Sequence, residues 1–201
     1  EFIYKHTNLN LLVVLKNTHL ENLSSASGLI NKWRFRLIHP LFFTEDYIKS
    51  SSDVFPIEFL DMQENYTVLW GRDVLKDVFI DTKNLRLQCE QELKGKLITL
   101  KQMYLRKNKD KVALRNLLFK SFTSMLHILR NVIRIKGKQP PYLKQDILKE
   151  IAVDFKTDKD TWEKILSLKN KQIKLSGAET EQLFIKFVKD LELIVDAIDK
   201  L

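Results

Sequence analysis

The sequence predicts an α+β protein, with a mixed β-sheet and flanking helices in the first part and a bundle of about five helices in the second. Three observations support this fold class. Apolar runs in the first 80 residues are short and rich in β-branched and aromatic residues, as in strands. After Asp81, apolar residues recur every three or four positions, as in helices. Only 5 glycines and 4 prolines occur in 201 residues, which favours long helices over many tight turns. We expect two domains, 1–80 and 81–201, packed against each other.

Candidate strands in the first domain are runs of about five to seven residues. They cover residues 9–15, 37–43 and 56–62, with a further short run at 67–70. A helix-like segment opening at Thr18 or Asn22 separates the first two runs, and its expected buried side is Leu23, Ile30, Trp33 and Leu37. A strand–helix–strand order implies a crossover connection within a mixed sheet. Thr44 is expected to cap a short helix that begins with two acidic residues.

The second domain contains the helical patterns. The apolar side of a long first helix carries Leu85, Cys89, Leu93, Leu97, Leu100 and Tyr104. A second helix carries Leu118, Phe122, Met125, Leu129 and Val132 and ends at Gly137. Shorter helices follow at 142–155 and 158–168. Ser176, with Glu179 three residues later, is a capping box that begins the last helix.

Charge is distributed unevenly along the chain, whose formal net charge is +8. Residues 1–80 hold 8 basic and 10 acidic side chains, whereas residues 81–201 hold 26 and 16. The basic half could attract phosphate, nucleic acid or an acidic partner, or it could be a solvated surface where Lys and Glu alternate. No apolar run approaches the roughly 18 residues of a membrane-spanning helix, so we expect no membrane partner. The single cysteine, Cys89, fits a core thiol in a cytoplasmic protein.

Residues 7–15, TNLNLLVVL, resemble the nucleotidyltransferase strand that reads Ser-Asp-x-Asp before aliphatic residues. Residues 56–61, PIEFLD, stand where that superfamily has its third carboxylate, and residues 68–71, VLWG, resemble its following turn. The helical half resembles bundles appended to minimal and aminoglycoside-modifying nucleotidyltransferases, some of which are HEPN-like. The resemblance implies a site for two divalent metals that bind nucleotide phosphates and activate an attacking hydroxyl.

The departures from this pattern imply a degenerate catalytic and metal site at Asn8, Asn10 and Glu58. Both positions that should be acidic are asparagines, and no Gly-Ser pair occurs before Asn8. A neutral amide is a weaker ligand than a carboxylate for a hard cation. We therefore expect a nucleotidyltransferase-like protein with impaired transfer, using Mg²⁺ and a nucleoside triphosphate if it is active and no cofactor otherwise. Alternatively, the asparagines form local hydrogen bonds and Glu58 pairs with a basic side chain.

A polar, largely basic stripe follows one side of the second long helix. Its members are Lys120, Thr123, His127, Arg130 and Arg134. His127, Arg130 and Arg134 could hold an anion such as nucleotide phosphate or the RNA backbone, or the stripe could be a solvated face or a homodimer contact. A second functional hypothesis is thus a non-catalytic module that binds protein or RNA through the bundle. A third is an analogue of adenylylating antitoxins in which the bundle is the regulated half.

Overall fold

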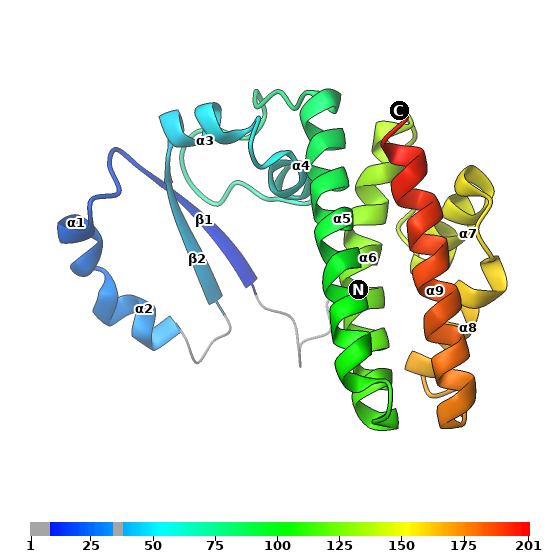
Figure 1. Ribbon diagram of the computed structural model, residues 1–201. Helices are drawn as coiled ribbons and strands as arrows, with labels where there is room; N and C mark the ends of the chain where they lie inside the picture. The colour runs from blue at the N-terminus through cyan, green and yellow to red at the C-terminus, as the bar shows by residue number, and fades with distance from the viewer. Residues whose placement is uncertain (1–8, 34–37) are drawn as a thin grey trace. The chain divides into compact units, whose positions relative to one another are not determined.

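The computed structural model describes residues 9–33 and 38–201 of the chain (Figure 1). The α+β class is confirmed, because a small parallel sheet precedes a helical region. The chain divides into two compact units, which we describe separately. The first comprises residues up to 54 together with 59–79, and the second comprises 55–58 together with 80–201.

The first unit is built on a parallel pair of strands joined by helices. Strand β1 (Leu9–Leu15) pairs with β2 (Ile38–Thr44), with Leu9 opposite Ile38 and Leu15 opposite Thr44. Two short helices, α1 (Leu20–Ser24) and α2 (Ser27–Trp33), lie in the connection, where one helical segment was expected. The predicted crossover is therefore confirmed. The described residues form only this parallel pair, so the larger mixed sheet is not found among them.

The segment after β2 is helical throughout. Helix α3 (Glu45–Ser51) begins as predicted, because the Thr44 hydroxyl accepts a hydrogen bond from the Tyr47 N–H at 3.0 Å. Helix α4 (Pro56–Glu64) occupies the run 56–62, so the strand prediction there is wrong. Proline is favoured at the first helical position, and Glu58 in the first turn interacts well with the helix dipole.

Residues 65–81 form a loop, so the strand predicted at 67–70 is also wrong. Leu69 and Trp70 are 76% and 95% exposed and have no neighbouring strand in the described sheet. The loop is instead held at its base by Gln63 of α4, whose side-chain amide donates to the carbonyls of Leu75 (2.7 Å) and Val78 (2.8 Å). Side-chain contacts therefore replace strand pairing as the means of fixing this segment.

The second unit confirms the bundle of about five helices. Residues 80–201, all of which the structure describes, contain α5 (Thr82–Lys107), α6 (Lys111–Ile135), α7 (Lys144–Phe155), α8 (Lys159–Lys169) and α9 (Gly177–Ile198) (Figure 1). Helix α6 contacts the other four and supplies much of the core. The capping box at Ser176 and Glu179 is present as predicted. Phe122, Trp162 and Phe187 form a fully buried aromatic cluster from three helices.

Lys156 ends α7 in a left-handed conformation, with a φ of 55°. Because glycine adopts this conformation without steric cost, Lys156→Gly is expected to raise the free energy of unfolding by about 0.5–1 kcal/mol. Urea denaturation followed by circular dichroism would measure the change. Lys159→Gly, at the beginning of α8, is the matched control and is expected to destabilise the protein. Equal or lower stability of the Lys156 variant would contradict the prediction.

Candidate functional site

Of the two asparagines predicted at the catalytic site, the structure describes Asn10, and Asn8 lies outside the described residues. Asn10 is the second residue of β1, opposite His39 of β2, and its side chain is exposed. The position can therefore be reached from solvent. The side chain offers one neutral carbonyl oxygen and an NH₂ group where the superfamily pattern has a carboxylate.

Glu58, the expected third carboxylate, lies in the first turn of α4. Its Oε2 accepts a hydrogen bond from Nε2 of Gln88 at 2.9 Å, and Oε1 of the same glutamine accepts one from the Ile57 N–H at 2.9 Å. One amide on α5 thus holds both the backbone and a side chain at the start of α4. The partner is neutral, unlike the basic residue considered above. Because Glu58 and Asn10 belong to different units, the convergence of the triad stays a prediction.

Metal binding at this site also stays a prediction. Within residues 9–33 and 38–201 no group of three or more His, Cys, Asp or Glu side chains could hold a metal ion. Hard divalent cations prefer several carboxylate oxygens, and Glu58 is the only acid among the predicted ligands. The described residues do not provide the donor set of a two-metal centre, so we derive no transfer step from them.

The basic stripe on α6 is organised by a buried amide. Asn131 is fully buried, and its Nδ2 donates to the His127 carbonyl at 3.1 Å while its Oδ1 accepts from the Arg134 guanidinium. The amide therefore fixes Arg134 relative to the helix. His127 is exposed, whereas Arg130 and Arg134 are half-buried. The structure places the three on one helix, and anion binding by them stays a prediction.

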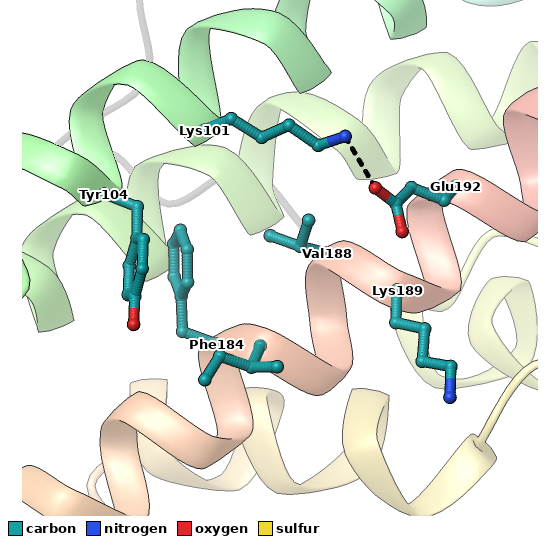
Figure 2. Close-up of a pocket in the computed structure, with 7 residues that line it drawn as sticks. Lys101, Tyr104, Phe184, Val188, Lys189 and Glu192 are labelled. Carbon is teal, nitrogen blue, oxygen red and sulfur yellow. Dashed lines mark ion pairs between the residues drawn. The ribbon is translucent and has the colours of Figure 1, made fainter.

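The structure shows a groove between α5 and α9 that the sequence did not reveal (Figure 2). Its volume is about 350 Å³, and it is lined by Lys101, Tyr104, Phe184, Ile185, Val188, Lys189 and Glu192. The Tyr104 and Phe184 rings stack with centroids 5.4 Å apart. The groove is at the small end of the usual range for ligand sites and carries no nucleophile beside a general base. We therefore assign no catalytic step to the groove.

Polar contacts join the two helices along this groove. Lys101 Nζ lies 2.6 Å from Glu192 Oε1, and the Tyr104 hydroxyl donates to Glu181 Oε1 at 2.7 Å. This hydrogen bond raises the pKa of Tyr104 and keeps the phenol a donor. The helical periodicity placed Tyr104 on the apolar side of α5 correctly. The two partners on α9 could not be predicted, because no local spacing rule links residues so far apart in the sequence.

Cys89 is fully buried on α5, as expected for a core thiol. Burial raises its pKa to about 12, with a further increase from Glu92 and a decrease from Arg134. We expect the native protein to react with a thiol reagent at pH 8 at least about a hundredfold more slowly than the urea-unfolded chain, because the thiolate is the nucleophile. Since the folded pKa is raised, the thiol's contribution to stability decreases as the pH rises above about 9. Equal rates for the native and unfolded chains would contradict a buried, protonated thiol.

No protein-family model matches the chain, and comparison with curated proteins and with solved structures found no similar protein. Among the helices of the described residues, none is both long and apolar enough to cross a membrane.

Proposed function

We propose that this chain is a nucleotidyltransferase-like protein whose metal-dependent transfer site is impaired. One observation supports the proposal above all. Asn10 lies at the exposed start of β1, in a parallel strand–helix–strand unit, where the resemblance expects one of a pair of carboxylates. Asn8, which the resemblance pairs with Asn10, lies outside the described residues.

The chemistry of the residues explains why transfer is expected to be impaired. Each Asp-to-Asn difference removes one formal negative charge from a site that would hold two dications and a triphosphate. Cation affinity in oxygen-ligand sites depends strongly on the number of charged ligands. The single charge of Glu58 does not replace the two charges lost at the asparagines, and its carboxylate already accepts a hydrogen bond from Gln88.

The double substitution Asn8→Asp and Asn10→Asp tests the proposal directly. Isotope-labelled protein would be titrated with Mn²⁺, whose unpaired electrons broaden the NMR signals of nearby nuclei. We expect selective broadening of the signals of residue 10 and of Leu11 in the double variant and none in the native chain. Serine at both positions is the matched control, because it changes the side chains without adding charge. Absence of broadening in the double variant, or equal broadening in the native chain, would overturn the proposal.

A non-catalytic role in binding another protein is the second candidate function, and the groove between α5 and α9 favours it. The groove exposes Ile185 and, in part, Val188 beside the Lys101–Glu192 ion pair, a mixture of apolar and charged groups typical of protein interfaces. RNA surfaces combine free basic residues with exposed aromatic rings on which bases stack, whereas here the Phe184 ring is buried against Tyr104 and Lys101 is paired with Glu192. A titration with single-stranded RNA at about 50 and 200 mM salt tests whether the chain binds RNA rather than a protein partner. RNA binding that weakens steeply with salt would contradict the preference for protein.

A further inference from the structure

The positive charge of the helical unit is concentrated in two short segments. Residues 106–115, which join α5 to α6 and begin α6, hold five basic side chains and one acid. Residues 169–174, which end α8 and lead toward α9, hold three basic side chains and no acid. The two segments together carry +7, against +8 for the whole chain. We call their eight basic residues the basic strip.

The two segments of the basic strip lie side by side. Lys169 reaches α6, where its Nζ lies 2.6 Å from Thr123 Oγ1 and 5.9 Å from the centre of the Phe119 ring. Gly177 begins α9 directly against Lys111, because a Cβ on this glycine would collide with the Lys111 side chain. Residues 169–177 therefore touch α6 at both ends and follow its first half. Figure 1 shows the α5–α6 turn and the start of α9 at the same end of the bundle.

The charges of the basic strip are not neutralised by ion pairs. Within residues 9–33 and 38–201, none of its side chains forms an ion pair, whereas Lys101 and Lys138 each contact a carboxylate. The acids nearest in the sequence on the α6 and α9 sides are Asp110 and Glu179. They accept backbone hydrogen bonds at the starts of these helices instead. The strip is thus a concentrated positive surface.

Repulsion between lysines is already visible at one end of the strip. Lys169 is half-buried on α8, and Lys144 begins α7. Burial lowers the pKa of Lys169, and the charge of Lys144 lowers it further. Both effects disfavour the charged form of Lys169. A bound anion would offset the repulsion, so the arrangement favours a negatively charged partner.

The length and charge of the strip match a nucleic-acid duplex. From Lys111 to Thr123, α6 spans twelve positions, or about 18 Å at 1.5 Å per residue. A duplex carries one negative charge per about 1.7 Å of its axis, so about ten phosphate charges face a strip with eight basic residues. Lysine and arginine are the usual contacts of backbone phosphates. We propose that the basic strip binds the phosphodiester backbone of a nucleic-acid duplex.

The surroundings of the strip favour a duplex over a single strand or a membrane. Proteins that bind single strands stack the bases on exposed rings, but residues 106–115 and 169–174 contain no aromatic residue. The neighbouring Phe119 ring is half-buried beside Lys169. Membrane-surface helices instead insert one apolar helix face, whereas this strip is formed by a turn, a helix start and a loop.

Fluorescence anisotropy of a labelled duplex of about 20 base pairs, titrated with the full chain in EDTA, tests the proposal. EDTA removes divalent metal, so the result does not depend on the proposed transfer site. We expect a dissociation constant on the order of 1 μM at about 50 mM salt. With about five phosphate contacts, binding should be about 500-fold weaker at 200 mM salt. DNA and RNA duplexes of one sequence show which backbone binds more tightly.

The double substitution Lys109→Gln and Lys174→Gln removes one exposed charge from each segment of the strip. It is expected to weaken duplex binding at about 50 mM salt at least about tenfold and to reduce the salt slope by about 1.8. Lys83→Gln with Lys200→Gln is the matched control. These exposed lysines lie at the other end of the bundle, at the start of α5 and after α9, and give the same net charge. The control is expected to bind as the native chain does.

Four results would overturn the proposal. The first is no binding of either duplex up to about 100 μM protein at about 50 mM salt. The second is an equal loss of binding in the two double variants, which would show a general effect of net charge. The third is a single strand of the same length that binds as tightly as the duplexes. The fourth is binding to vesicles of anionic lipid but to neither duplex.

Discussion

Trp162→Ala is expected to lower the free energy of unfolding by about 3–5 kcal/mol, the cost of removing a large aromatic side chain from a packed core. Trp162 is fully buried on α8. Its ring lies 5.1 Å from the Phe187 ring, edge to face at 76°, and 6.2 Å from the Phe122 ring. The substitution would leave a cavity where three helices meet, and the rigid neighbouring rings can fill little of it.

Trp70→Ala is the matched control, because Trp70 is 95% exposed and its loss is expected to change stability by less than about 0.5 kcal/mol. Urea denaturation should be followed by far-ultraviolet circular dichroism, which does not depend on tryptophan emission. Similar effects of the two substitutions would contradict the assignment of Trp162 to the core.

Gln63→Glu is expected to destabilise the first unit locally by about 2–3 kcal/mol at pH 7. The native amide donates to the carbonyls of both Leu75 and Val78, and each such bond contributes about 1 kcal/mol. The introduced carboxylate has the same shape but cannot donate, and it faces two carbonyl oxygens. The two carbonyl oxygens would raise the pKa of this carboxylate. As the pH falls, the carboxylate is protonated and can donate one hydrogen bond, so the variant should regain part of its stability.

Hydrogen exchange measured by mass spectrometry would locate this effect. Peptides covering residues 65–80 should exchange faster in the Gln63 variant, while peptides from α6 should not change. Gln102→Glu, at an exposed position of α5, is the control and is expected to leave both regions unaffected. Unchanged protection of 65–80 would show that Gln63 does not hold the loop.

The helical unit was predictable because its signals are local. Asp81 and Ser176 accept backbone hydrogen bonds at the starts of α5 and α9, and apolar residues at helical spacing mark the buried sides. The run 56–62 was mispredicted because a short apolar segment can be a strand or a buried helix. Its helical state depends partly on Gln88, which binds the Ile57 N–H across 31 positions of sequence. No local pattern contains that contact.

The candidate site was predictable only in part. The sequence placed Asn10 near the start of a strand at 9–15, and the structure has it as the second residue of β1. It also assigned Glu58 to a strand, whereas the structure has Glu58 at the beginning of a helix. The groove was missed because Lys101 and Glu192 come together only when α5 and α9 pack. Local patterns predict which residues are exposed but not which exposed residues meet.

Calorimetric titration of the full native chain with Mn²⁺ and ATP together tests the central claim most directly. A nucleotidyltransferase-like protein with two asparagines in place of carboxylates is expected to show no metal-dependent ATP binding below about 1 mM. ATP without metal is the control for anion binding at His127, Arg130 and Arg134, which would persist when the metal is removed. Metal-dependent binding with a dissociation constant in the micromolar range would contradict an impaired site.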